Sequence, residues 1–201
     1  YVQLEPVKKK FLRRHFGSDE GDLYEGTLSD FDRDWYKTFE PKTDETDANY
    51  GPILDVMETL GAGDGTLEDM LEEHFDLENT LTHLAMENIV GHMDGYAGRN
   101  RNNFFIYRDD ASDKFHFMTW GVDWVMQTAR LEQGLPTHSV LMRAILKDPD
   151  LSDALESRTR ELLETHWVES EILAEIDAME ALLSTEIDMS KLDDEVDALR
   201  D

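Results

Sequence analysis

The feature that most constrains the fold of this chain is a helix that runs into a polar loop, within residues 76–103. Asp76 is a favourable N-cap, and apolar residues follow it at helical spacing until the helix ends near Gly91. The loop at 94–103 is rich in Asp, Asn, Gly and Arg, which are residues typical of turns. The sequence therefore predicts a packed helix that delivers a polar loop to the next element.

That next element is predicted to be a β-hairpin. Phe104–Tyr107 is a short apolar run typical of a buried strand, and 109–113 has the composition of a turn. Phe115 and Phe117 alternate along the returning strand. The hairpin ends at 120–124, with the sequence Trp-Gly-Val-Asp-Trp.

The residues before this segment are predicted to form short helices and a long loop. We expect a basic helix at 6–16 and a locally ordered loop at 17–51, which is rich in Gly, Asp and Thr. Apolar residues from Ile53 recur at helical spacing until Gly61, and a further short helix carries Leu67. The first four residues are typical of a strand.

The residues after the hairpin, 126–201, are predicted to be helical. One apolar stripe within them has offsets of four, four, three and four, and we expect it to be buried against the lobe or a second chain: Val168, Ile172, Ile176, Met179 and Leu183. The predicted fold class is α+β, mainly helical, with one small β-hairpin. Because the chain opens without methionine, we expect it to be part of a longer protein.

Charge and composition exclude several classes of function. The chain has 46 acidic and 19 basic residues and a net charge of −27, so binding to nucleic-acid phosphates is disfavoured. Residues 1–16 are the exception, with five basic groups and one acidic group. There is no cysteine, which excludes disulfides and thiol nucleophiles. No apolar run approaches the roughly 20 residues that a membrane helix needs.

Three polar residues stand where phosphoryl transfer would need them. A loop Asp can accept or orient the proton of a substrate hydroxyl, a downstream Asn can bind one metal ion, and an Asp past the hairpin can bind the metal that bridges the nucleotide phosphates. Asp94, Asn103 and Asp123 occupy these places, and we expect Asp94 and Asn103 to converge on one cleft. The alternative is that they are ordinary turn residues. The histidines lack metal-site spacing, and no serine has the context of a hydrolase nucleophile.

The amino-acid sequences of these segments closely resemble those of the CotH kinase family of spore-coat proteins. The resemblance covers roughly residues 1–125 and is weaker in the helices beyond. It is carried by the strings Leu84–Val90, Met93–Tyr96, Asn103–Tyr107 and Phe117–Asp123, with Phe11–Gly17 and Gly21–Gly26 nearer the start.

The resemblance implies the helical C-lobe of an atypical protein kinase, in a domain that spans residues 1–201 and lacks most of its nucleotide-binding lobe. It implies the use of ATP and a divalent metal such as Mg²⁺ to phosphorylate serines of spore-coat or cell-surface proteins. By that resemblance Asp94 is the catalytic base, Asn103 and Asp123 are metal ligands, and Glu5 belongs to the cofactor-binding lobe.

The sequence departs from the family pattern at the hairpin exit. The family usually has Pro-Trp-Asp-x-Asp there, but Thr119 replaces the proline and Gly121 replaces the first Asp, the principal metal ligand. Glu25 stands where the family usually has a lysine. The leading hypothesis is therefore serine phosphorylation by the intact parent protein, with this chain impaired. The alternative is a non-catalytic coat or surface protein, a pseudokinase that keeps the fold for binding or assembly.

Overall fold

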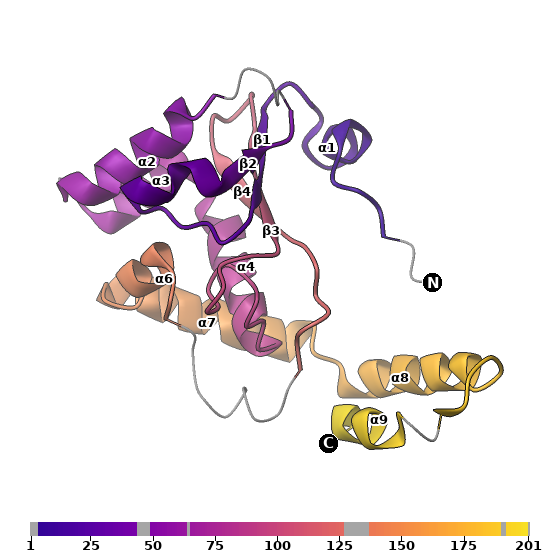
Figure 1. The fold of residues 1–201 in the computed structure, drawn as a ribbon. Helices are drawn as coiled ribbons and strands as arrows, with labels where there is room; N and C mark the ends of the chain where they lie inside the picture. The colour runs from indigo at the N-terminus through magenta and orange to yellow at the C-terminus, as the bar shows by residue number, and fades with distance from the viewer. Residues whose placement is uncertain (1–3, 44–48, 64, 127–136, 190–191, 201) are drawn as a thin grey trace.

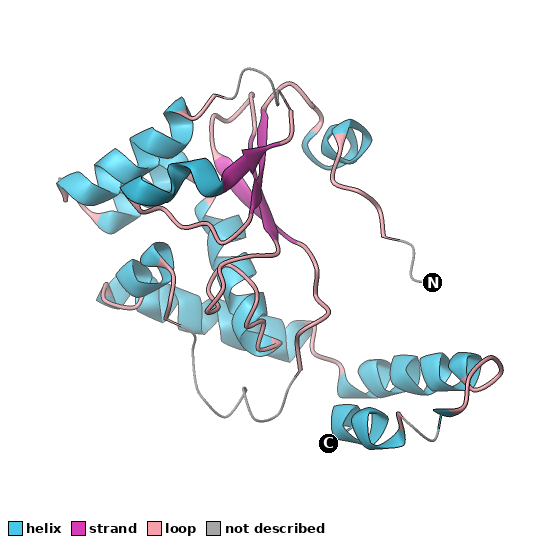
Figure 2. Ribbon diagram, viewed as in Figure 1, coloured by secondary structure: helices cyan, strands magenta, loops and turns pink. Residues whose placement is uncertain are grey.

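The protein is an α+β structure built around a four-stranded antiparallel sheet (Figure 1, Figure 2). This computed structural model describes residues 4–43, 49–63, 65–126, 137–189 and 192–200. Most of the expected N-terminal strand therefore lies outside the described residues. The order of strands across the sheet is β2-β1-β3-β4, with these bounds: β1 Asp22–Gly26, β2 Phe39–Pro41, β3 Phe104–Arg108 and β4 Phe115–Thr119.

The predicted hairpin is confirmed as β3 and β4, with Phe104 paired to Thr119 and Arg108 to Phe115. The expectation of a loop over 17–51 is wrong, because this stretch contains β1, the 3-10 helix η1 (Arg33–Thr38) and β2. Both faces of β1 are covered, so Leu23 and Tyr24 are buried side by side. Such a strand shows no alternation of polar and apolar residues, and its two apolar residues looked like an isolated island.

The inner face of the sheet forms the main core with three helices, α2 (Gly51–Ala62), α3 (Leu67–His74) and α4 (Leu77–Ile89). Asp76 caps α4 as expected, because its Oδ1 accepts a hydrogen bond of 2.8 Å from the Asn79 backbone. The Asn79 side chain in turn bonds the backbone N–H and C=O of Phe117. Helix α4 is thereby fixed to β4, and its C-terminal end directs the polar loop toward the hairpin exit.

Helix α1 (Lys9–Phe16) covers part of the outer face of the sheet. It begins later than expected, since Lys8 is extended and serves as the N-cap position. Its one fully buried residue, Leu12, packs with Leu23, Phe105 and Tyr107. Beside α1, a pocket lined in part by Leu23 and Phe105 remains on this face.

The remaining helices of the body complete the inner core. Helices α6 (Val140–Ile145) and α7 (Pro149–Thr165) lie in the segment predicted to be helical, and Asp148 caps α7 ahead of Pro149. Gly61 does not end α2 as expected. Gly63 does so instead, because at φ +65° it takes the left-handed conformation that closes a helix.

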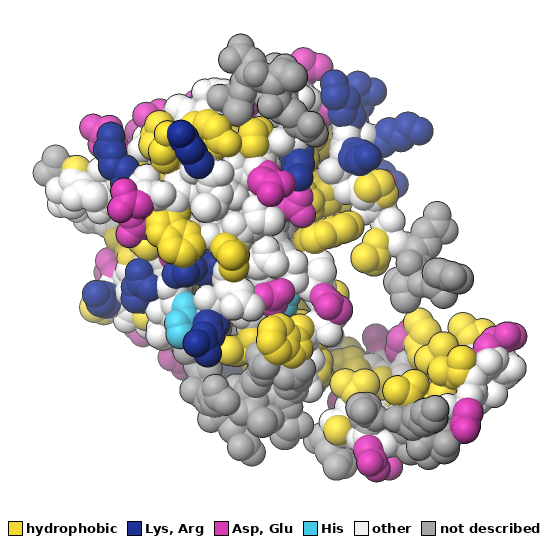
Figure 3. Space-filling view, viewed as in Figure 1, with side chains coloured by type: hydrophobic (Ala, Val, Ile, Leu, Met, Phe, Trp, Pro, Cys, Tyr) yellow, Lys and Arg dark blue, Asp and Glu magenta, His cyan; other side chains and the backbone are white. Residues whose placement is uncertain are grey.

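The C-terminal apolar stripe is not buried against the lobe, which was one of the two partners expected for it, and burial against a second chain stays a prediction. Helix α8 (Glu169–Leu183) has no buried residue and packs beside α9 (Asp193–Arg200), away from the body (Figure 1). Figure 3 shows hydrophobic side chains gathered on this pair of helices. Spacing identified an apolar face correctly but could not show what covers it. In the described part of the chain, no helix has the length and apolar character needed to span a bilayer.

Candidate active site

The structure brings Asp94 and Asn103 into direct contact at the hairpin exit, which confirms the expected convergence of these two side chains. Asn103 Nδ2 donates to Asp94 Oδ2 over 2.8 Å, and Asn100 Nδ2 donates to Asp94 Oδ1 over 2.6 Å. Asp94 is half-buried in this loop. Both carboxylate oxygens therefore accept amide hydrogen bonds, an arrangement that holds the group in one orientation.

The Asn103 amide also reaches across to the end of the hairpin. Its Nδ2 donates to the carbonyl of Gly121 over 3.0 Å. Because a carboxylate and a carbonyl can only accept, the amide nitrogen and not its oxygen must face this pair. Asn103 has φ +51°, a left-handed conformation that asparagine adopts more readily than most residues, and this conformation precedes β3 directly. The loop and the hairpin exit are thereby joined by one side chain.

Gly121 is tightly constrained in this arrangement. It has φ +57°, and a Cβ added to it would lie 2.8 Å from Asn103 Cγ. A side chain at this position therefore requires both a left-handed backbone and a displacement of Asn103. The backbone and the space around residue 121 thus suit the glycine that replaces the family's aspartate.

Asp123 and Glu5 are not part of this cluster. Asp123 is exposed, and within the described residues no hydrogen bond or ion pair connects it to Asp94 or Asn103. Glu5 is exposed and forms an ion pair with Arg14 of α1. The four residues singled out from sequence thus separate into one pair in contact and two that lie apart from it.

A pocket lies on the outer face of the sheet, between this face and the segment that leads into α1. It has a volume of about 470 Å³ and is lined by α1 residues such as Leu12 and by sheet residues such as Leu23. Its floor includes Phe105, two residues after Asn103, and Trp120, which directly precedes Gly121. The two rings pack edge to face with centroids 5.7 Å apart. The pocket combines these aromatic rings with charged residues such as Lys42, and its lining includes neither Asp94 nor Asn103, so only the chain connects it to the polar cluster.

The rim of this pocket carries a charged pair. Lys42 Nζ lies 2.6 Å from Glu25 Oε2 and 3.0 Å from Glu40 Oε2. Hydrogen bonding to Glu25 raises the pKa of Lys42 above its usual value, although partial burial opposes this. Glu25 is the position at which the family pattern has a lysine. Lys42, which directly follows β2, is thus paired with the glutamate that stands in place of the family lysine.

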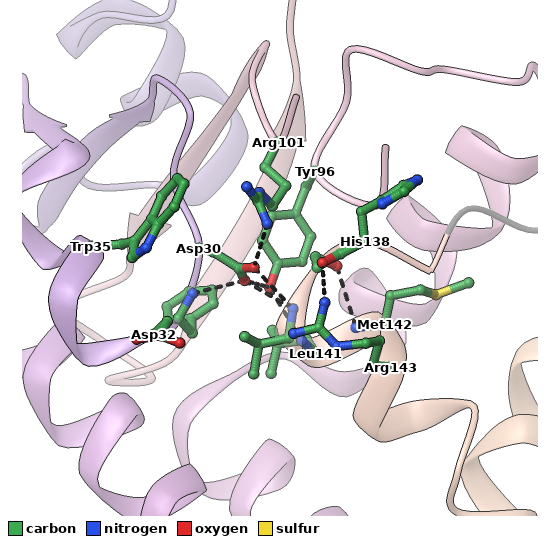
Figure 4. A network of polar contacts seen from close by, with 12 residues as sticks. Asp30, Asp32, Trp35, Tyr96, Arg101, His138, Leu141, Met142 and Arg143 are labelled. Carbon is green, nitrogen blue, oxygen red and sulfur yellow. Dashed lines mark hydrogen bonds and ion pairs between the residues drawn. The ribbon is translucent and has the colours of Figure 1, made fainter. Parts of the chain in front are cut away.

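A buried network that sequence reasoning missed holds the polar loop from its other side (Figure 4). Asp30 Oδ1 accepts from the backbone of Val140 over 3.0 Å and from the Tyr96 hydroxyl over 3.2 Å. Arg101 Nη1 lies 3.5 Å from Asp30 Oδ2, and the guanidinium stacks 4.6 Å above the Trp35 ring. Burial raises the pKa of Asp30, and its backbone hydrogen bonds reduce that rise. Nothing in the local sequence around Asp30 distinguishes it from a turn residue.

The donors present fit a magnesium ion only in part. Mg²⁺ is usually held by one or two carboxylates together with substrate phosphates. Around Asn103 there are one carboxylate, from Asp94, and the carbonyl of Gly121, and a reversed amide would add a third oxygen. No group of three or more His, Asp or Glu side chains that could hold a metal occurs among the described residues. The cluster therefore fits a Mg²⁺ ion whose remaining ligands are phosphate oxygens of a bound nucleotide better than it fits Mg²⁺ held by protein groups alone.

A family model described as CotH kinase protein matches residues 1–195, nearly the whole chain. A search of curated proteins finds no match.

Proposed function

Since the chain belongs to the CotH kinase family, we propose that its parent protein transfers phosphate from ATP to serine hydroxyls of coat or surface proteins, and that Gly121 makes this chain slow. The observation that carries the proposal is the contact of Asp94 with Asn103. A pocket lined by Phe105 and Trp120, which are near Asn103 and Gly121 in the chain, supports it. A catalytic base and a metal-binding amide are parts that the catalytic loop of a kinase-like C-lobe contributes.

Within this proposal each residue has a specific task. Asp94 orients the serine hydroxyl and accepts its proton, and the amides of Asn100 and Asn103 fix the direction of its carboxylate. The aromatic floor of the pocket binds the nucleotide base. Magnesium, when bound, would neutralise phosphate charge, with Asn103 turned so that its oxygen faces the ion and Asp123 available from the exposed segment beyond.

Gly121 limits the reaction because it supplies no carboxylate at the hairpin exit. Asp123 lies two residues further on, is exposed, and among the described residues forms no hydrogen bond or ion pair with Asp94 or Asn103, so it does not replace the missing group directly. Loss of a metal-directed charge worth several kcal/mol of transition-state stabilisation corresponds to roughly 10²-fold in rate or more. We therefore expect magnesium to bind only together with nucleotide, and weakly.

The test compares Gly121→Asp with Gly121→Asn in the full-length parent protein. Both substitutions impose the same left-handed strain and displace Asn103, but only Asp adds a charge. We expect Mg²⁺-dependent phosphorylation of a serine substrate to be roughly 10²-fold or more faster in Gly121→Asp than in the parent and in Gly121→Asn. Equal rates in all three, at measurable activity, would show that another group carries the metal.

A second candidate function is favoured by the hydrogen bonds of Asn103. In the structure its amide nitrogen bridges Asp94 and Gly121, so the cluster is closed upon itself and satisfied without a metal. A non-catalytic coat or surface protein would keep such a closed cluster for stability. Absence of nucleotide binding in a thermal-shift assay, with Mg²⁺ and with Gly121→Asp alike, would favour this candidate.

A further inference from the structure

A fully buried carboxylate, Glu87 on α4, binds the backbone of the loop that carries Asp94. Glu87 Oε1 accepts from the Tyr96 N–H over 2.8 Å, and Oε2 accepts from the Ala97 N–H over 2.7 Å. The side chain is 1% exposed. A buried charge is costly unless it is paired and hydrogen-bonded. The two backbone N–H groups of the loop supply hydrogen bonds that offset this cost for Glu87.

A buried histidine also lies close to the Glu87 carboxylate. His83 Nε2, one helical turn earlier on α4, lies 3.0 Å from Glu87 Oε1. His92, which follows the helix, also approaches Glu87, with Nδ1 at 3.7 Å. Burial alone would raise the pKa of Glu87, but its interactions with His83 and His92 and the hydrogen bond from Ala97 together lower it to about 2.

The same histidine reaches the end of the hairpin. His83 Nδ1 lies 3.2 Å from Thr119 Oγ1, and its ring stacks on Phe117 with centroids 4.9 Å apart. Thr119 is the last residue of β4 and stands two positions before Gly121. A continuous series of contacts therefore runs from Thr119 through His83 and Glu87 to the loop backbone.

This series connects the two segments whose separation defines the candidate active site. One end holds the loop within two residues of Asp94, and the other end holds β4 within two residues of Gly121. The loop leaves little room for adjustment, because a Cβ added to Gly95 would lie 2.2 Å from Glu87 Oε1. A rigid carboxylate beneath the loop fixes where Asp94 can lie.

We propose that Glu87 and His83 are positioning residues that set the distance between Asp94 and the hairpin exit, through the contacts Thr119–His83–Glu87–Tyr96. They touch neither Asp94 nor the groups that would react. The inference rests on the proposed function only in describing the Asp94 loop as catalytic, because the contacts themselves exist without nucleotide.

The test is NMR spectroscopy of the chain itself, without ATP or metal, comparing Glu87→Gln with the matched control Met86→Gln. Gln keeps the shape of Glu87 but can accept from only one of the two loop amides, and Met86 is exposed on the same helix. We expect hydrogen exchange at Tyr96 or Ala97 to become at least about tenfold faster in Glu87→Gln. Leu84 and Ala85 of α4 should exchange as in the parent.

The decisive signal is the side-chain amide of Asn103, which reports its bond to Asp94. We expect this signal to shift in Glu87→Gln and to be unchanged in Met86→Gln. A folded Glu87→Gln protein with an unmoved Asn103 signal would overturn the proposal, since Glu87 would then stabilise the core without positioning the site.

A milder variant keeps the proposal testable if Glu87→Gln does not fold. Thr119→Val removes only the hydroxyl that contacts His83, at an exposed strand end. We expect the Asn103 amide signal to shift in this variant too, by less than in Glu87→Gln. An unchanged signal would show that the contacts do not transmit position from β4 to the loop. Neither measurement depends on nucleotide binding, so failure of the proposed function would be seen separately.

Discussion

The Asp94 loop and the C-terminal helices differ in what the protein buries. Around the loop, polar side chains such as Asp30 and Glu87 are almost completely buried, and each is hydrogen-bonded. In α8 and α9 the opposite holds, because apolar side chains such as Met179 and Leu182 are at least half exposed. The difference shows that burial in this chain follows tertiary neighbours rather than the polarity of the residue.

The consequence is that the loop is a structural part of the body, whereas α8 and α9 contribute little to its stability. Two buried carboxylates, Glu87 of α4 and Asp30 of the segment before η1, accept hydrogen bonds from the loop, and so does the half-buried Gly121 carbonyl at the hairpin exit. Helix α8 makes its main contacts with α9. Substitutions in the two regions should therefore have effects of very different size.

The largest effect is expected where the hairpin meets the core. Phe104 is fully buried next to Tyr96 and Phe117, so Phe104→Ala should lower the free energy of unfolding by about 3–5 kcal/mol. Urea denaturation followed by circular dichroism measures this. Phe11→Ala on the half-buried outer face is the control and should cost less. Equal losses would mean that the two faces of the sheet stabilise the body equally.

A smaller effect is expected from pH, through Glu87. Its pKa is lowered to about 2 in the folded protein, so its contribution is fully present above the ordinary value of 4.5 and is lost as the pH falls from 4.5 towards 2. The contribution should amount to roughly 3 kcal/mol. Urea denaturation between pH 5 and 3 should show a shallower loss of stability in Glu87→Gln than in Met86→Gln. Parallel curves would contradict the assignment.

The smallest effect is expected in α8. Leu182 is 64% exposed, so Leu182→Ala should change the free energy of unfolding by no more than about 0.5 kcal/mol. The measurement is best repeated at several protein concentrations. A large loss that depends on concentration would break the comparison, because it would show that a second copy of the chain covers this apolar face in solution.

The parts of the fold that sequence predicted are those determined by local signals. Asp76 has the chemistry of an N-cap, and the apolar residues of α4 and the alternation of Phe115 and Phe117 indicate their own elements. Strand β1 was missed because it is short and covered on both faces. Burial of α8 against the lobe was predicted wrongly, because an apolar stripe says nothing of the surface that it contacts, and burial against a second chain stays a prediction.

The candidate site divides in the same way. Asp94 and Asn103 were found because they flank one loop, and their roles remain predictions. Asp30 could not be found, because it acts over a separation of more than a hundred residues, through Val140. The direction of the Asn103 amide was also beyond the sequence, since it depends on which acceptors surround it in space.

Gly26 at the end of β1 carries a consequence for how this protein tolerates genetic change. It pairs with Phe104 across the sheet, and a Cβ added to it would lie 2.2 Å from the Phe104 ring. Any other residue would push that ring, and Phe104 is bonded covalently to Asn103. A substitution at Gly26 would therefore displace Asn103 indirectly. A screen of variants that measured only ligand binding would then assign Gly26 to the candidate active site, although it does not belong to it. Its true role is to leave a space that a neighbour fills.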